Sequence, residues 1–573
     1  MARGNHSLLE GYFHIAFFSM EIGVNPKIPT YSGGLGILAG DVLRSCADLN
    51  VPIVAMTLTS NKGHIAQKLD SEGNQTEFFK SWRIDDFATL KPGKISVPIE
   101  GRDVKVQAWE YKLTGREGHQ LPVYFLDTNL YENAEADREI TSYLYGGDER
   151  YRLAQEIVLG IGGVRMLDAL GQHNISKYHL NEGHSALAAL ELMKKMKQEH
   201  PRYTHEQLLE AVRDRCVFTT HTPVPAGHDQ FAASLVEQLM GTYCDAEEMK
   251  HICDGRPLNM TLLALEHSGY INGVAKRHEE ISRDMFPGYP IDSITNGVHH
   301  VFWTAEPFRT LYDSHISGWR KDPFNLRYVI QIPLEEIQEA HRAAKKRLID
   351  FVNARHDAGM TYDAFTLGFA RRMTRYKRPH LLFTNTQWLA AIAKQVGPIQ
   401  VIMAGKAHPK DTFGKDLIRQ IFAAIKELAG EVKIVFMEDY DMELALLLTS
   451  GVDVWLNTPK IPCEASGTSG MKACLNGIPS LSVLDGWWVE GCVEGVTGWA
   501  IETKVADVCE LQMNDAEEAE SLYRKLEEVV IPLYYNDKRD AWAQIMRYAI
   551  AFNGSFFNSH RMVQQYLLNA YFA

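Results

Sequence analysis

The sequence predicts an α/β fold in two large domains, and three observations support this prediction. The chain has 573 residues, more than a single hydrophobic core usually accommodates. Short runs that are apolar on both faces recur along it, as in the buried strands of a parallel sheet. Segments of helical length separate these runs, so we expect each sheet to be covered by helices.

Composition limits the partners and the location of the protein. The 59 Lys and Arg and the 72 Asp and Glu give a formal net charge of −13, which argues against nucleic acid and anionic membranes as partners. Any anion must therefore bind at a local cationic site. The eight cysteines include no C-x-x-C pair, so we expect neither a metal site nor a disulfide framework. The sequence shows no signal segment and no apolar run of about 18 residues, and we expect a cytoplasmic protein.

The first domain is predicted to cover residues 1–330 and to hold a parallel sheet. The segment 71–116 is charged and in places alternates apolar with polar residues, which favours an antiparallel excursion at the surface. Helices are expected at residues 152–170 and 205–213. The predicted strands are residues 14–21, 51–58, 123–127, 177–181 and 216–220.

A helix within residues 331–358 is predicted to connect this domain to a second one, because residues 334–352 place apolar side chains at helical spacing. The second domain is expected at residues 359–548, and a C-terminal helix within 549–573 is expected to pack back toward the first domain. The strands of the second domain are predicted at residues 365–370, 400–405, 432–438, 452–457 and 480–484. Each run ends in small or polar residues, which is typical of parallel strands whose carboxyl ends carry a site.

The segment 464–472, EASGTSGMK, combines small residues with a single lysine at the start of a helical stretch. Small residues let backbone amides approach an anion closely. Lys472 lies between Met471 and Ala473, and apolar surroundings lower the pKa of an amine and favour the neutral form required to form an imine. The segment suggests a Schiff base between Lys472 and pyridoxal phosphate, although an ordinary surface lysine would also fit the pattern.

Two other stretches contain groups suited to phosphate. Residues 371–378 place five cations directly after a predicted strand, where fixed positive charge would offset the desolvation of a phosphate. A solvated charged helix face explains this run about equally well. Residues 31–41 place glycines before an apolar helix whose amides could face an anion. A tight turn without a ligand explains those glycines at least as well.

Three stretches place His or Asn at predicted strand ends or loops, namely residues 180–184, 218–225 and 295–303. Imidazole and amide groups suit hydrogen bonding to the several hydroxyl groups of a sugar. A structural role is the commoner explanation for any single histidine, but one polar site explains the three stretches together.

These residues resemble those of the α-glucan (glycogen, starch, maltodextrin) phosphorylases, of a short prokaryotic type. The likeness is specific in residues 464–472, followed by Leu-Asn-Gly at 475–477 and Leu-Asp-Gly at 484–486. It covers most of the chain in one order. It extends to SGGLG at 32–36, HT at 221–222, INGVAK at 271–276, TNG at 295–297, Arg372 with YKR at 376–378, GKA at 405–407 and Tyr440.

The resemblance implies two Rossmann-like domains facing a cleft, which is the GT-B fold, and a pyridoxal 5′-phosphate cofactor. It implies reversible, retaining phosphorolysis of the terminal α-1,4-linked glucose of a glucan or maltooligosaccharide by inorganic phosphate, giving glucose 1-phosphate. The phosphate of the coenzyme, rather than its ring, would exchange a proton with the substrate phosphate. A homodimer is usual in the family.

By motif match, the resemblance also implies roles for individual residues. Lys472 would hold the cofactor, and Trp303 would lie near it. The catalytic group would consist of Lys472, Arg372, Lys377, His221 and Gly34, of which Arg372, Lys377 and the amide of Gly34 would bind the substrate phosphate. The coenzyme phosphate would be bound by Arg371, Tyr440, Gly467 and Thr468. The sugar would be bound by Asn296, His221, Glu464, Ser466, Gly467 and Asp148.

Several positions depart from the pattern of the family. Arg371 and Thr374 stand where Lys and His are usual, Asp441 stands in place of Arg, and the pair Trp487 and Trp488 is bulkier than usual. These departures leave the acceptor preference open. A short loop before Arg152 and a start close to the first strand predict a compact, largely unregulated enzyme of bacterial or archaeal type.

Two other functions stay open at the level of sequence. One is a nucleotide-sugar-dependent glucan synthase of the same fold, which shares a glycine turn and paired cations but does not need Lys472. The other is a catalytically silent glucan-binding protein.

Overall fold

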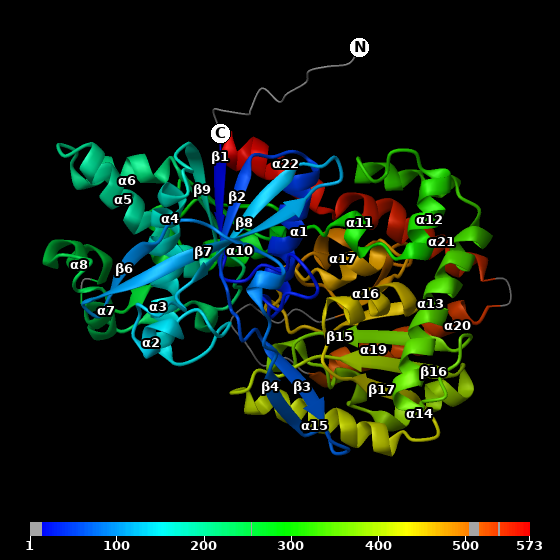
Figure 1. Ribbon diagram of the computed structural model, residues 1–573. Coiled ribbons are helices and arrows are strands. Elements are labelled where there is room, and N and C mark those ends of the chain that lie inside the picture. The colour runs from blue at the N-terminus through cyan, green and yellow to red at the C-terminus, as the bar shows by residue number, and fades with distance from the viewer. Residues whose placement is uncertain (1–13, 254, 503–514, 537–538, 573) are drawn as a thin grey trace, which may run out of the picture. The chain divides into compact units, whose positions relative to one another are not determined.

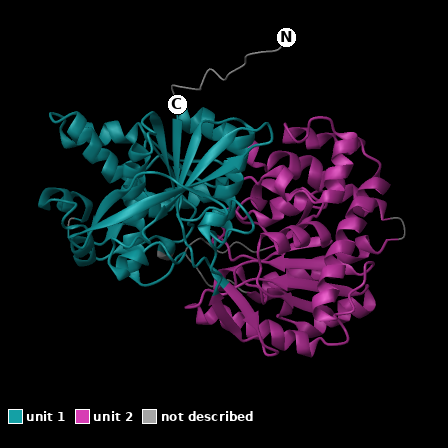
Figure 2. Cartoon of the chain, viewed as in Figure 1, with its two compact units in different colours: residues 1–65, 79–294, 562–573 teal, residues 66–78, 295–561 magenta. Residues whose placement is uncertain are grey.

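The computed structural model describes residues 14–253, 255–502, 515–536 and 539–572, which form two compact units (Figure 1 and Figure 2). The first unit takes in residues up to 65, 79–294 and 562 onward, and the second takes in residues 66–78 and 295–561. The domain boundaries expected at 330, 358 and 548 stay a prediction. The N-terminal residues that show no signal segment, and Cys509, lie outside the described residues.

The first unit is built on a sheet that has ten strands within the described residues. Their bounds are β1 His14–Phe18, β2 Ile53–Leu58, β5 Thr89–Leu90, β6 Ile95–Ile99, β7 Arg102–Thr114, β8 Gln120–Asp127, β9 Ile175–Asn181, β10 Cys216–Thr219, β13 Tyr270–Gly273 and β14 Ile291–Ser293. All five strands predicted for this half are confirmed. The antiparallel excursion is confirmed as well, because β7 pairs antiparallel with β5, β6 and β8.

Seven strands of this sheet are parallel and lie in the order β14-β13-β10-β9-β1-β2-β8. The chain builds outward in one direction from β1 through β2 to β8 and in the other from β9 to β14. The direction therefore reverses between β1 and β9, and such a switch point is where open α/β sheets bind ligands, at the carboxyl ends of the strands.

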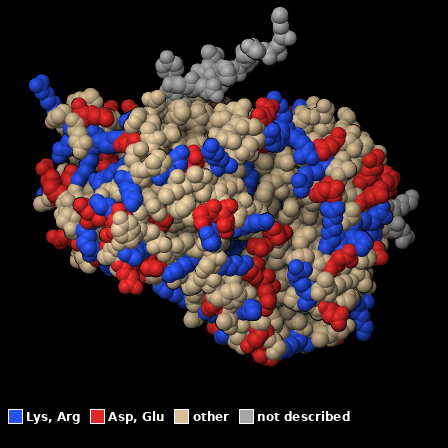
Figure 3. All heavy atoms as spheres, viewed as in Figure 1, with Lys and Arg blue, Asp and Glu red and all other residues tan. Residues whose placement is uncertain are grey.

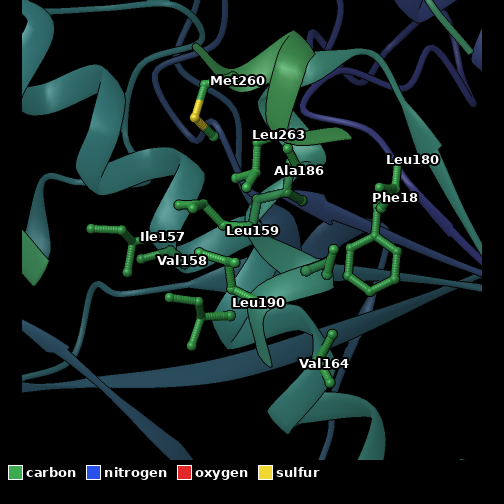
Figure 4. Close-up of a cluster of buried hydrophobic side chains, with 14 of the residues drawn as sticks. Phe18, Ile157, Val158, Leu159, Val164, Leu180, Ala186, Leu190, Met260 and Leu263 are labelled. Carbon is green, nitrogen blue, oxygen red and sulfur yellow. The ribbon is translucent and has the colours of Figure 1, made fainter. Parts of the chain in front are cut away.

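Helices cover this sheet, and their bounds are α1 Gly34–Asp48, α2 Glu135–Arg138, α3 Glu149–Ile157, α4 Gly163–Ala169, α5 Leu187–Glu199, α6 His205–Arg213, α7 Ala233–Met240, α8 Ala246–Cys253, α9 Met260–Glu266 and α10 Lys276–Met285. The helix predicted at 152–170 is observed as α3 and α4 joined by a π-helical turn, Val158–Gly162. Figure 4 shows this turn in the core, where Val158 and Leu159 lie among the side chains of β1, β9 and α5.

The C-terminal helix α22, Ser559–Tyr566, and the π turn Leu567–Tyr571 that follows it confirm the predicted helix. From residue 562 on, this segment belongs to the first unit. Tyr566 Oη lies 3.0 Å from Thr219 Oγ1, and Tyr571 Oη lies 2.6 Å from His179 Nδ1. The end of the chain is thus part of the core around β9 and β10.

The second unit is built on a six-stranded sheet whose neighbouring strands pair in parallel within the described residues. The strands are β15 Phe365–Ala370, β16 Ile399–Ala404, β17 Lys433–Met437, β18 Val454–Asn457, β19 Ser480–Val483 and β20 Gly498–Ile501. The first five were predicted; β20 has four residues and was not. The order β17-β16-β15-β18-β19-β20 is the 3-2-1-4-5-6 order of dinucleotide-binding (Rossmann) domains, with its switch point between β15 and β18.

The helices of the second unit include α13, Leu334–His356, which confirms the helix predicted within residues 331–358; that it connects two domains stays a prediction. The others are α11 His300–Trp303, α12 Glu306–His315, α14 Thr386–Gln395, α15 Thr412–Glu427, α16 Met442–Gly451, α17 Ser469–Cys474, α18 Trp488–Gly491, α19 Asp515–Lys525, α20 Ile531–Tyr534 and α21 Asp540–Tyr548. A hairpin from the first half of the chain, β3 Ile65–Leu69 and β4 Gln75–Phe79, contributes residues 66–78 to this unit. The α/β class with parallel sheets is therefore confirmed for both units.

Three properties of the described residues bear on the expectations from composition. On the face drawn in Figure 3, cationic and anionic side chains are intermixed, as expected if an anion binds only at a local site. Among the described residues, no helix is both long enough and apolar enough to cross a bilayer. The cysteines within the described residues are all free thiols.

Candidate active site

The predicted cations and the EASGTSGMK segment meet at the switch point of the second sheet. β15 runs directly into Arg371, and the loop after β18 leads to Glu464. Because β15 and β18 are adjacent and parallel, their carboxyl ends lie at the same edge of the sheet. The topology therefore brings together two stretches that are about 90 residues apart in the sequence.

Glu464 lies at the centre of this site and binds two of the predicted cations. Its Oε1 accepts a hydrogen bond from Arg371 Nη2 at 2.9 Å, and its Oε2 lies 2.5 Å from Lys377 Nζ. All three side chains are buried or nearly so. Burial alone would raise the pKa of Glu464, but the charges of Arg371 and Lys377 outweigh it and lower this pKa to about 2. The carboxylate is therefore ionised and orients both cations.

Arg371 retains unused hydrogen-bonding capacity. Its Nη1 is buried and has no hydrogen-bond partner among the described residues, although a buried guanidinium normally satisfies its donors. An anion such as a phosphate oxygen would satisfy this donor. The observation fits the prediction that Arg371 binds a phosphate group.

Lys472 is buried, as its apolar neighbours predicted, and not on the surface. It lies in α17, and its Nζ is 3.8 Å from the centroid of the Trp303 ring, which is fully buried. Asn476 holds the two residues together, because its Nδ2 donates to Trp303 O at 2.8 Å and to Lys472 O at 3.0 Å. The Leu-Asn-Gly motif signalled Asn476, but its role is visible only in the structure.

A turn after β19 supports the loop that carries Glu464 and Ser466. Glu464 N donates to Asp485 Oδ2 at 2.9 Å, and Trp487 N donates to Ser466 O at 2.9 Å. A Cβ atom at Gly486, which has φ +55°, would lie 2.3 Å from Ser466 O, so only glycine allows this close approach. Burial, followed in size by the charge of Glu464, raises the pKa of Asp485 to about 7, against two opposing backbone hydrogen bonds.

In the first unit, His221 follows β10 and is held by two residues at the end of β9. Its Nε2 lies 2.8 Å from Asn181 Oδ1, and its backbone N–H donates to Glu182 Oε2 at 2.8 Å. Burial lowers the pKa of His221 to about 3, so the ring is neutral. Because Asn181 Oδ1 is an acceptor, Nε2 carries the ring proton and Nδ1 can accept a hydrogen bond from a hydroxyl group.

Glu182 was not predicted as a functional residue, although it lies in a stretch that was singled out. Its side chain also accepts hydrogen bonds from Gly183 N and Thr222 Oγ1, both at 2.9 Å. Its backbone has φ +84° and ψ +161°, a conformation that strains a residue with a side chain and that occurs mainly where the surroundings enforce it. Glu182 therefore fixes the loop that carries His221.

The glycine turn before α1 is held in a similar way by Glu21, at the end of β1. Glu21 Oε2 accepts from Ser32 N at 2.6 Å and from Gly33 N at 3.3 Å, and Oε1 accepts from Tyr145 Oη at 2.8 Å. A Cβ atom at Gly34 would meet nothing within 4 Å, so the protein leaves space beside this amide. The bonds to Glu21 occupy the amides of Ser32 and Gly33, the two residues before Gly34. That the amide of Gly34 binds an anion stays a prediction.

The remaining predicted residues fall in different environments. Asn296 is buried, and its Oδ1 has no hydrogen-bond partner among the described residues, which suits a sugar hydroxyl. Arg372 is exposed, and Tyr440 is half-buried, three residues after the end of β17. Asp148 is exposed and caps α3 by accepting from Tyr151 N. The departure at Asp441 has a structural role, because its side chain caps α16.

The structure thus joins Arg371, Lys377 and Glu464 in one cluster and Lys472 with Trp303 in another, both within the second unit. Gly34, His221 and Asp148 belong to the first unit. That these two sets form one site stays a prediction, as do the roles of Ser466, Gly467 and Thr468.

Three buried histidines, His299, His300 and His560, bring ring nitrogens within 4.8 Å of one another in the second unit, where no metal site was expected. His300 Nε2 lies 2.9 Å from Arg320 O, and His299 Nδ1 accepts from Phe302 N at 3.1 Å. A neutral imidazole that accepts at Nδ1 carries its proton on Nε2, so His299 would have to give up this helix-capping bond to ligate a metal. We interpret the three rings as a packed aromatic cluster.

Fold and site together define an α/β protein with a cationic site at the switch point of a Rossmann-ordered sheet. The family model for carbohydrate phosphorylases matches residues 229–529. The chain is 37% identical to the maltodextrin phosphorylase of Thermococcus litoralis over 96% of its length and 70% of the relative. It is 36% identical to the glycogen phosphorylase of Aquifex aeolicus over 97% of the chain and 86% of the relative, and 34% identical to that of Mycobacterium tuberculosis over 97% and 70%. The chain belongs to the carbohydrate phosphorylase family.

Proposed function

We propose that this protein is an α-glucan phosphorylase that transfers the terminal α-1,4-linked glucose of a glucan or maltooligosaccharide to inorganic phosphate, reversibly and with retention, giving glucose 1-phosphate. Family membership supports the reaction class. The observation on this chain that best supports the proposal is the buried cluster of Arg371, Glu464 and Lys377. In this cluster, Nη1 of Arg371 has no hydrogen-bond acceptor among the described residues.

We propose pyridoxal 5′-phosphate as the cofactor, held covalently by Lys472. The buried lysine over Trp303 and the unsatisfied donor of Arg371 both fit this group. Arg371, Tyr440, Gly467 and Thr468 would hold its phosphate. When bound, the coenzyme supplies a phosphate that exchanges a proton with the substrate phosphate.

The residues of the chain bind and orient the reactants. Arg372, Lys377 and the amide of Gly34 would hold inorganic phosphate beside the anomeric carbon, and their positive character would offset its charge. The phosphate gives its proton to the glycosidic oxygen, the bond from that oxygen to the anomeric carbon breaks, and a phosphate oxygen bonds to the same face of that carbon. The carbonyl oxygen of His221 would stabilise the positive charge that develops on the sugar.

The sugar would be oriented by hydrogen bonds from both units. The proposed ligands of its hydroxyl groups are His221, Asn296, Glu464, Ser466, Gly467 and Asp148. In this proposal the two units have the GT-B arrangement, with a cleft between them, and the protein is a cytoplasmic homodimer.

The test is release of glucose 1-phosphate from maltoheptaose and inorganic phosphate, measured by a coupled assay. We expect release that depends on phosphate and that is lost in Lys472→Ala. Borohydride reduction followed by peptide mapping should place a pyridoxyl group on Lys472. A protein that carries the group but releases no glucose 1-phosphate would be the silent glucan-binding protein, and transfer of glucose from a nucleotide sugar would identify a synthase.

A further inference from the structure

The hairpin β3–β4 docks on the second sheet through two glutamine side chains. Gln67 is buried, at 2% exposure. Its Nε2 donates to Gly405 O at 2.9 Å, and its Oε1 accepts from Asp439 N at 3.1 Å. Gly405 directly follows β16 and Asp439 comes two residues after β17. One side chain therefore bridges the carboxyl ends of two adjacent strands.

Gln75 binds the same loop two residues further along, at Ala407. Its Nε2 donates to Ala407 O at 2.8 Å, and its Oε1 accepts from Ala407 N at 3.0 Å. The side-chain amide of Gln75 thus bonds both the N–H and the C=O of one residue, as a residue of a neighbouring strand can do. Gln67 Nε2 also donates to Gln75 Oε1 at 2.8 Å, so the two amides form one connected network, which orients both of them.

The loop held by the hairpin is bonded on its other side to the cationic segment. Met373 N donates to Lys406 O at 2.9 Å, and Arg371 N donates to Ala404 O at 3.2 Å. A Cβ atom at Gly405 would lie 1.8 Å from Arg371 O. Residues 404–407 therefore lie between the hairpin and the backbone of Arg371. At Gly405 the two are so close that no side chain would fit.

Tyr440 lies next to the same network in the sequence. It follows Asp439, whose backbone N–H is bonded to Gln67 and whose Oδ1 lies 2.6 Å from Lys406 Nζ. The two side chains proposed to hold the coenzyme phosphate, those of Arg371 and Tyr440, thus extend from loops that Gln67 and Gln75 hold in place.

We infer that Gln67 and Gln75 are positioning residues for the phosphate-binding loops, and that the hairpin from the first half of the chain sets the affinity of the second unit for the phosphate of its coenzyme. This inference rests on the proposed function. Groups that orient the ligands of a bound group commonly matter about 10-fold for affinity.

The test compares Gln67→Leu and Gln75→Leu with a control on the same hairpin, Glu72→Gln. Leucine keeps the volume of glutamine and removes its hydrogen bonds. Glu72 lies at the exposed tip of the hairpin and pairs with Lys426, away from the loops. Each protein is stripped of coenzyme, its melting temperature is recorded, and it is titrated with pyridoxal 5′-phosphate and separately with pyridoxal, which lacks the phosphate.

We expect the dissociation constant for pyridoxal 5′-phosphate to rise about tenfold in both leucine variants and to stay at the wild-type value in Glu72→Gln. Binding of pyridoxal should be the same in all four proteins, because the loops act on the phosphate. If Gln67→Leu does not fold, the test rests on Gln75→Leu, which replaces a half-exposed residue.

Three results would overturn the inference, and they differ in meaning. Unchanged affinity of both leucine variants for the coenzyme, with normal binding by the wild type, removes the inference alone. Weaker binding of pyridoxal to the same extent would also remove it, since the loss would then be general. A wild type that binds no coenzyme removes the proposed function together with the inference.

Discussion

The structure shifts the charge state of Asp485. It is buried beside Glu464, and its carboxyl accepts hydrogen bonds from Glu464 N and Gly486 N. Burial is the largest cause that raises its pKa, to about 7 from a usual value of 3.8; the charge of Glu464 adds to it, and the two backbone hydrogen bonds oppose it. Between about pH 4 and pH 7 the folded protein therefore binds a proton at Asp485 that the unfolded chain has lost, so this group makes the protein less stable as the pH rises through that range.

Asp485→Asn removes this titration. We expect the variant to gain stability relative to the wild type between pH 5 and pH 8, by about 2–3 kcal/mol, since one pKa unit corresponds to about 1.4 kcal/mol. Thermal unfolding at the two pH values measures the difference. Ser482→Ala, a nearby buried substitution that changes no charge, serves as the control and should show an offset independent of pH. A constant offset for Asp485→Asn as well would show that Asp485 is ionised throughout.

Three residues act by holding the backbone at or beside a predicted site residue. Glu21 bonds the amide of Gly33, next to Gly34, Glu182 bonds the amide of His221, and Asn476 bonds the carbonyl of Trp303. Their partners lie 12, 39 and 173 positions away in the sequence, so local spacing does not predict these contacts. In contrast, the burial of Lys472 was predicted from its neighbours in the sequence, Met471 and Ala473.

At the scale of single elements, helix α13 is attached to the second sheet by a buried ion pair. Lys345 Nζ lies 2.5 Å from Asp453 Oδ2 and donates to Ala364 O at 2.7 Å. His341, one turn earlier, lies 2.9 Å from the other carboxylate oxygen. Asp453 comes immediately before β18, one of the two strands that define the switch point. This contact therefore fixes the helix on the strand that leads to the site.

Lys345→Met should lower the free energy of unfolding by about 3–5 kcal/mol, because it leaves the buried carboxylate of Asp453 without its main counter-charge. Lys346→Met is the matched control on the same helix. Lys346 pairs with Asp350 at the surface, and such pairs contribute about 0–1 kcal/mol. Chemical denaturation of both variants measures the difference, and equal losses of stability would contradict the proposed attachment.

The elements themselves follow local sequence to different extents. The long or strongly apolar ones, such as β15, β16 and α13, were predicted close to their observed bounds. The strands β13, β14 and β20 have three or four residues and were missed, whereas β10, β18 and β19, with four residues each, were predicted within slightly longer apolar runs. Pairing with a neighbouring strand, which only the assembled sheet provides, makes them strands.

At the scale of the whole molecule, the chain passes between the two units more than once, and its last segment belongs to the first unit. Tyr566 and Tyr571 are buried in the first core beside β9 and β10. The first unit therefore includes residues that come after the whole second unit in the sequence, and its stability depends on them.

Tyr566→Ala should destabilise the first unit by about 3–5 kcal/mol, the usual loss for a large aromatic side chain removed from a core. Hydrogen exchange should show the loss of protection in peptides covering β9 and β10, while peptides covering β15 and β16 keep theirs. Leu568→Ala, at a position that is 73% exposed, should change stability by no more than about 0.5 kcal/mol. A uniform loss of protection in both units would show that they unfold together.

The sequence by itself determined the α/β class, most strands of both sheets, the burial of Lys472 and the family, because apolar periodicity and short motifs are local properties of the chain. Tertiary structure alone decided the order of the strands, and with it the switch point where Arg371, Lys377 and Glu464 meet. It also decided that Glu182 holds His221 and that Gln67 and Gln75 hold the loops beside Arg371 and Tyr440. These are hydrogen bonds between residues as many as 372 positions apart, and their existence depends on the topology that packing selects.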